Sequence, residues 1–170
     1  SNKNIWFVGG GKLVRGDVSF SCFNNPTKAE PYQTDVYNKG KLWRTKNGGS
    51  SWDEVGGDIN SEAQIGPIKI HPKNSQLVFA ATTHGVYRST DGGDNWTNIT
   101  LGKIDNNIIM DLDYYHNSET DKFILYIIDQ VQFLANGNTT KSSGGVYESS
   151  DSGDTWKNIN GNLYLDLNRL

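Results

Sequence analysis

Short apolar runs, broken by clusters of glycine, asparagine and aspartate, follow one another along the whole sequence. They are rich in Val, Ile, Tyr, Phe, Trp and Thr, and no long segment has the 3.6-residue spacing of an amphipathic helix. Runs of this length and composition are typical of β-strands. In the middle of the chain, strands are predicted at residues 65–71, 77–82, 86–89 and 96–100. In the last part of the chain, strands are predicted at residues 108–115, 124–129, 146–149 and 156–159. The pattern predicts an all-β protein.

One octet occurs three times and fits the pattern Ser/Thr-x-Asp/Asn-x-Gly-x-x-Trp. We call residues 45–52, 89–96 and 149–156 the first, second and third octets. Each follows a short predicted strand and leads into an alternation of polar and apolar residues. A repeat of a whole strand–turn–strand unit indicates a repetitive β architecture.

The residue types of the octet suit a tight β-hairpin corner. An Asp or Asn side chain accepts backbone N–H bonds in its own turn, a glycine supplies positive φ, and a tryptophan has the area to anchor the next strand. We therefore expect structural roles, with the tryptophans buried, for Asn47, Gly49 and Trp52, for Asp91, Gly93 and Trp96, and for Asp151, Gly153 and Trp156. Arg44 and Arg88 precede two octets at equivalent positions, which also indicates a structural role.

The three octets resemble the Asp-box (BNR) repeat of sialidases, sortilin-type (VPS10) receptors, xyloglucan-cleaving glycoside hydrolases and photosystem assembly factors. The resemblance implies an incomplete β-propeller of about three four-stranded antiparallel blades. Residues 1–170 would then be part of one propeller domain. Blade one would span 5–60 without its inner strand, blade two 65–101 and blade three 108–160, while 163–168 would be the inner strand of a next blade.

A ring needs about four blades or more, so three cannot close it. We therefore expect the ring to be completed either by remaining blades of a longer chain or by a second copy of this one. The first alternative, in which this chain is a fragment of a longer one, is favoured.

Two insertions separate the second and third strands of their blades, at about 10–40 and 130–144. By resemblance to the enzyme families, this end of the blades binds the ligand. Tyr32 and Tyr37 are candidate ligand contacts, although the aromatics of this insertion also suit a small core of its own. Asp111 and Asp113 lie two apart on an inner strand and Asp166 lies on the last one; the alternative for these acids is simple solvation in a central channel.

The composition of the chain excludes several classes of function. The chain has 16 basic and 19 acidic residues, a balance that argues against nucleic-acid binding. It has a single cysteine, three histidines without metal-ligand spacing, and no apolar run long enough to span a membrane. We expect no cofactor, no metal and no complete catalytic set.

The sequence thus predicts a secreted or cell-surface propeller fragment that acts as a glycan- or protein-binding scaffold. One alternative is part of a sialidase-like or xyloglucanase-like glycoside hydrolase whose catalytic residues lie partly outside this chain. Another is a sortilin-like transport or assembly accessory.

Overall fold

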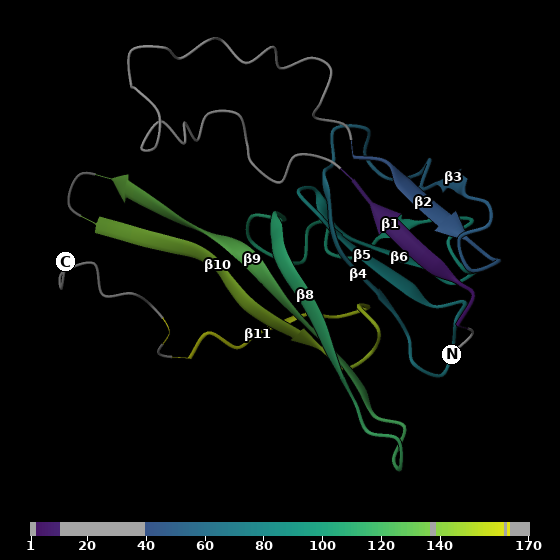
Figure 1. Cartoon of the computed structure of the whole chain (residues 1–170). Helices are drawn as coiled ribbons and strands as arrows, with labels where there is room; N and C mark the ends of the chain where they lie inside the picture. Colours follow the sequence, from purple (N-terminus) through teal and green to yellow (C-terminus); the bar gives the residue numbers. More distant parts are fainter. Residues whose placement is uncertain (1–2, 11–39, 137–138, 162, 164–170) are drawn as a thin grey trace, which may run out of the picture.

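The computed structural model describes residues 3–10, 40–136, 139–161 and 163, and in these residues the chain forms eleven strands and no helix. The strands make three antiparallel sheets (Figure 1). Strand bounds of the first sheet are β1 (Trp6–Gly9), β2 (Leu42–Thr45) and β3 (Asp53–Val55). The second sheet contains β4 (Ile65–Ile70), β5 (Val78–Thr82), β6 (Gly85–Ser89) and β7 (Thr97–Asn98). The third contains β8 (Ile109–His116), β9 (Phe123–Asn136), β10 (Thr139–Ser149) and β11 (Lys157–Asn158).

The strands of each sheet pair in chain order, as in a meander. Strands β1, β5 and β9 occupy equivalent places, because each pairs with the strand that leads into an octet. The register makes the equivalence residue by residue: Arg44 lies opposite Phe7, Arg88 opposite Phe79, and Glu148 opposite Tyr126. The same hairpin is therefore built three times.

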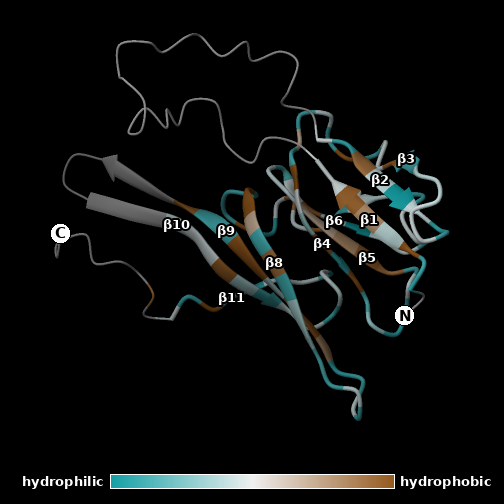
Figure 2. Cartoon of the chain, in the orientation of Figure 1, coloured by the Kyte–Doolittle hydropathy of each residue, from teal (hydrophilic) through white to brown (hydrophobic). Residues whose placement is uncertain are grey.

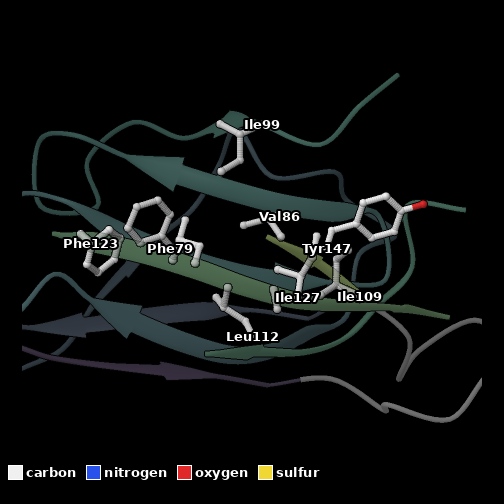
Figure 3. Packing of buried hydrophobic residues seen from close by; sticks show 10 residues of the cluster. Phe79, Val86, Ile99, Ile109, Leu112, Phe123, Ile127 and Tyr147 are labelled. Atoms are coloured by element: carbon white, nitrogen blue, oxygen red, sulfur yellow. The ribbon is translucent and has the colours of Figure 1, made fainter. Parts of the chain in front are cut away.

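The buried apolar residues form two layers, each between neighbouring sheets. Figure 2 shows the hydrophobic stretches of the strands, in brown, for example on β1 and β8. Strand alternation sends Val78 and Ala80 of β5 toward the first sheet, and Phe79 and Ala81 toward the third. The layer between the second and third sheets contains Phe79, Val86, Ile109, Leu112, Phe123 and Ile127, with Ile99 and Tyr147 (Figure 3). The layer between the first and second sheets contains Leu42, Ile65, Tyr87 and Trp96. The second sheet is thus buried on both faces.

The all-β fold class is confirmed, with three antiparallel sheets of three or four strands. One expectation about a loop is wrong. Residues 130–144 were expected to be an insertion between strands, but β9 and β10 continue through most of them as a paired hairpin. The first insertion and the predicted strand at 163–168 lie outside the described residues, apart from Leu163.

Candidate functional site

The octets form tight corners held by side chains that bond to the backbone of their own turn. In the second octet, the Ser89 hydroxyl oxygen accepts the Gly93 N–H at 2.7 Å, and Asp91 Oδ1 accepts the N–H groups of Asp94 and Asn95 at 3.0 Å each. The third octet repeats this arrangement, since Ser149 Oγ accepts from Gly153 N. The leading hydroxyl was not singled out from the sequence, although all three octets carry one.

A left-handed backbone at the octet glycine is common to all three corners. The φ angles of Gly49, Gly93 and Gly153 are 94°, 96° and 95°. A side chain there would be strained, and at Gly153 a Cβ would also run into the Ile99 side chain. Glycine is therefore required by conformation and by the approach of the neighbouring sheet.

The octet carboxylates are held in their ionised form. Hydrogen bonds from the Asn95 side chain and backbone, and from Ser89, hold the pKa of Asp91 well below its usual range. Burial raises the pKa of Asp151, but the hydrogen bonds from Thr155 and Ser149 outweigh it and bring the pKa to about 2. An acid that is ionised at every physiological pH and bonded to its own turn is suited to structure and not to proton transfer.

The octet tryptophans do not share one environment. Trp96 is 5% exposed, and Phe7 of the preceding sheet meets its ring edge-on, with 6.3 Å between centroids. Trp156 is half-buried, and its indole N–H donates to Ile99 O of the preceding sheet at 3.1 Å. The expected burial of Trp52 is wrong: this residue is 37% exposed. Trp96 and Trp156 pack against the preceding sheet, whereas within the described residues no sheet precedes the one that carries Trp52.

Two arginines link neighbouring sheets. Arg44 Nη1 of the first sheet donates to Gly92 O of the second octet at 2.7 Å and lies 2.7 Å from Asp94 Oδ1. Arg88 of the second sheet bonds to the third octet in the same way. Its Nη1 donates to Ser152 O at 2.9 Å and to Asp154 Oδ1 at 2.7 Å. Both arginines are therefore engaged in holding the sheets together.

Asp111 and Asp113 both lie exposed on β8, but their surroundings differ. Asp111 Oδ1 accepts the N–H of Leu112 at 2.8 Å. Asp113 pairs with Lys69 of β4 at 2.9 Å, and the hydrogen bond from Lys69 holds its pKa below the usual range. A general acid in glycoside hydrolysis needs a raised pKa. Asp113 is thus poorly suited to that role.

One fully buried carboxylate, that of Asp129, was missed in the sequence. Burial raises its pKa, while N–H groups of Asn106 and Ile108 donate to its two oxygens at 2.8 and 2.9 Å. The Gly144 N–H donates to Asp105 Oδ2 at 2.8 Å close by. These bonds tie the connection that enters β8 to the strands β9 and β10, and nothing in the local sequence distinguishes Asp129 from an exposed acid.

Beyond this point the third sheet continues as a two-stranded projection. We call residues 130–136 and 139–144 the arm. Its two strands pair with each other from Asn136–Thr139 to Gln132–Ser143. The flanking strands stop earlier, because β8 pairs with β9 only as far as Asp129 and β11 pairs with β10 only at Tyr147 and Glu148. Figure 1 shows the arm extending past the ends of β8 and β11.

The remaining candidate residues cannot be placed. Tyr32, Tyr37 and Asp166 lie outside the described residues. Three or more side chains suited to holding a metal ion do not converge anywhere in the described part of the chain. The same part contains no helix long and apolar enough to cross a membrane.

The geometry of three repeated sheets joined through their octets agrees with comparison to known proteins. The family model of Sortilin-Vps10, whose description reads sortilin, neurotensin receptor 3, matches residues 40–164. This chain belongs to the Sortilin-Vps10 family. The match includes all three octets.

The chain is also similar to a xyloglucanase and to a GH74 enzyme. The xyloglucanase Xgh74A of Acetivibrio thermocellus is 23% identical over 140 residues, which cover 73% of this chain and 16% of the relative. The crystal structure of an ancestral GH74 enzyme matches 72% of this chain and 15% of its own, with a TM-score of 0.51 and 24% identity. This Sortilin-Vps10 chain therefore has a propeller-type fold and spans about a sixth of the relatives that it matches.

Proposed function

We propose that this chain is part of an extracytoplasmic β-propeller that binds a polypeptide ligand at the end of its sheets opposite the octets. The arm is the observation that carries the proposal. Strand β10 runs from the arm to the third octet, so the two lie at opposite ends of the sheet. Beyond Gln130, which donates to Ile108 O, and Gly144, which donates to Asp105 Oδ2, neither outer edge of the arm pairs with another strand in the described residues. An open strand edge is a template for an extended peptide.

Family membership supports binding over catalysis. The family is described by the name of a receptor, and receptors bind their ligands without transforming them. The octet acids of this chain bond to their own turns, and Asp113 is paired with Lys69. The extracytoplasmic location rests on the resemblance to sortilin-type receptors. A sortilin-like transport or assembly accessory would use the same surface.

A glycan is the second candidate ligand, and the similarity to a xyloglucanase favours it. In this case Tyr32 and Tyr37 would stack against sugar rings, since an aromatic face suits the apolar face of a sugar. Gly9 and Leu42, which lie opposite each other in the register, join the first insertion to the end of the first sheet away from its octet. The two candidate ligands would therefore bind to different insertions, both at the end of the sheets opposite the octets.

Shortening the arm tests the polypeptide proposal. Asp129 lies opposite Gly145 as Thr82 lies opposite Gly85, where two residues, Thr-His, close the hairpin. Replacing 130–144 by Thr-His gives a variant without the arm. Peptides selected from a random display library on the intact chain should bind this variant at least about tenfold more weakly. Equal binding to both proteins would contradict the proposal.

A matched variant separates the two candidate ligands. The double change Tyr32→Ala with Tyr37→Ala leaves the arm intact, so selected peptides should bind it as they bind the unchanged chain. Xyloglucan oligosaccharides serve as the glycan probe, in binding calorimetry. If these oligosaccharides bind the chain and the double variant loses them while the arm-shortened variant does not, the glycan candidate replaces the polypeptide one.

A further inference from the structure

The contact between neighbouring sheets follows one rule in both places where the structure describes it. An arginine that lies eight residues before an octet tryptophan reaches the next octet along the chain. There it donates to the carbonyl after the octet's Asp and pairs with the acid two residues further on, as Arg44 does with Gly92 and Asp94. Arg88 makes the equivalent pair of contacts with the third octet.

In the third sheet a glutamate stands at the arginine position. Glu148 lies eight residues before Trp156 and opposite Tyr126, as Arg88 lies eight before Trp96 and opposite Phe79. Within the described residues, its ion-pair partner is Lys157 of the same sheet, at 3.5 Å. A carboxylate accepts hydrogen bonds and cannot donate to a carbonyl as the two arginines do. An equivalent contact between Glu148 and a further octet would therefore need the opposite charge in that octet.

The face of the third sheet that carries Glu148 is open in the described structure, and it combines apolar side chains with the exposed carboxylates of Asp111 and Asp113. Leu125 and Ile127 of β9 point toward the second sheet and are buried, so strand alternation sends Tyr126 and Ile128 to the other face. On that face Ile128 is 42% exposed and Met110 is 57% exposed. In the second sheet, Ala81 occupies the position equivalent to that of Ile128, and Ala81 is fully buried under the third sheet. This face of the third sheet is an inter-sheet surface without a described neighbour.

We propose that the outer face of the third sheet binds a further octet-bearing sheet in which a lysine or arginine occupies the position of Asp94 and Asp154. The apolar residues of the face supply the surface area that becomes buried on contact. The charge of Glu148 determines which octet can bind. The charge reversal distinguishes this contact from the two inside the chain. It therefore admits one kind of neighbour and rejects an octet with an acid at that position.

A second copy of this chain fits the surface poorly. Its free octet is the first one, where Ser50 stands at the position of Asp94 and Gly48 supplies the carbonyl. Head-to-tail association would bring the Glu148 carboxylate toward that carbonyl oxygen, with serine in place of a cation. The Ser50 hydroxyl, which donates to Asn47 O in its own turn, offers Glu148 at most one neutral hydrogen bond and no charge, so the two facing acceptors are poorly compensated. The occupant is thus an octet of another sequence, in the same polypeptide or a different one.

The first octet can be changed into the octet that the proposal requires. Ser50 is exposed, so Ser50→Arg in the full chain presents a cation where Glu148 of another copy should bind it. Sedimentation equilibrium should show head-to-tail association at least about tenfold stronger than that of the unchanged chain, and this association should weaken with salt. Ser61→Arg is the matched control, because it adds the same charge at an exposed site outside the octets and should leave the mass unchanged.

A charge swap completes the test. Ser50→Asp should associate no more strongly than the unchanged chain, whereas Ser50→Asp combined with Glu148→Arg should associate, because the pair rebuilds the Arg88–Asp154 contact between copies. Thermal unfolding of each variant checks that it is folded. The proposal is overturned if Ser50→Arg and the swapped pair both keep the mass of the unchanged chain. The proposal is also overturned if the unchanged chain associates as strongly as the Ser50→Arg variant and if this association is lost in the Glu148→Arg variant.

Discussion

At the scale of single residues, each octet corner combines a leading hydroxyl, an acid or amide, and a glycine in the left-handed region. The hydroxyl and the acid satisfy backbone N–H groups that a tight corner otherwise leaves without partners. In the first octet Asn47 takes the place of aspartate, and its Oδ1 still accepts from Ser51 N at 2.9 Å. The corner therefore needs an acceptor at this position more than it needs a charge.

Acid sensitivity follows from the octet carboxylates. Asp151 has a pKa of about 2 in the folded chain, against about 3.9 for an unfolded aspartate. A folded-state pKa that is lowered stabilises the fold above pH 4–5 or so, and this contribution is lost as the pH falls toward 2. In Asp151→Asn, an amide as in the first octet keeps the acceptor and removes the titration. The thermal midpoint of this variant should fall less steeply between about pH 5 and pH 2, and an unchanged acid profile would contradict the argument.

The three tryptophans differ in what truncation should cost. Trp96 is enclosed between two sheets, so Trp96→Ala should lower the free energy of unfolding by about 3–5 kcal/mol. Trp52 is partly solvated, and the same truncation there should cost about 1 kcal/mol or less. Urea unfolding of the two variants of the isolated chain measures both. Equal losses would mean that the open face of the first sheet is covered in solution.

At the scale of elements, sheets are joined by apolar layers and by one arginine at each junction. Arg44 is 5% exposed in its side chain, while Lys41 of the same strand region pairs with Glu54 at the surface, with 60% exposure. Arg44→Met should cost about 1.5–3 kcal/mol, because it leaves hydrogen bonds to a charged donor unmade. Lys41→Met should cost about 0.5 kcal/mol or less. Similar costs for the two variants would show that the arginine contributes no more than a surface charge.

The repeat explains why most strands could be predicted from the sequence. Three octets fix the strand before and after each corner, and β5 (Val78–Thr82) and β6 (Gly85–Ser89) lie within one residue of the predicted ranges 77–82 and 86–89. The arm could not be found in this way. Residues 139–144 are Thr, Thr, Lys, Ser, Ser and Gly, which lack the alternation that marks a half-buried strand, and the pairing of the arm depends on backbone bonds within a two-stranded ribbon. The Asn-Gly pair at 136–137 is a hairpin signal that would have identified it.

Burial was harder to predict than strand position, because it depends on neighbours and not on local pattern. Trp52 and Trp96 occupy the same octet position, yet the first sheet has no described neighbour on the side where Trp52 lies. Asp113 illustrates the same limit. Its spacing from Asp111 suggests a carboxylate pair, but Lys69 comes from β4, more than forty residues earlier in the chain. Contacts between sheets thus decide which candidate acids remain available for chemistry.

At the scale of the whole molecule, the surroundings of the carboxylates decide whether they can serve in catalysis. Hydrolysis of a glycosidic bond needs one carboxyl that stays protonated and a second that is ionised. Asp113 is held ionised by Lys69, and Asp129 has a raised pKa but is fully buried and bonded to backbone N–H groups. Neither of these two carboxyls is therefore suited to act as the acid of such a pair.

Xyloglucan and sialoside substrates should consequently show no turnover with this chain above the uncatalysed blank. The measurement is release of reducing sugar, or of sialic acid, at several pH values, because a general acid with an ordinary pKa would act only at low pH. The variant Lys69→Met makes the test sharper, because it removes the ion pair of Asp113. The pKa of that carboxyl should then rise toward the ordinary value, and the variant should still show no activity. Turnover by the unchanged chain that disappears in Asp111→Asn or Asp113→Asn would contradict this expectation, and it would make the inner strand β8 a catalytic element.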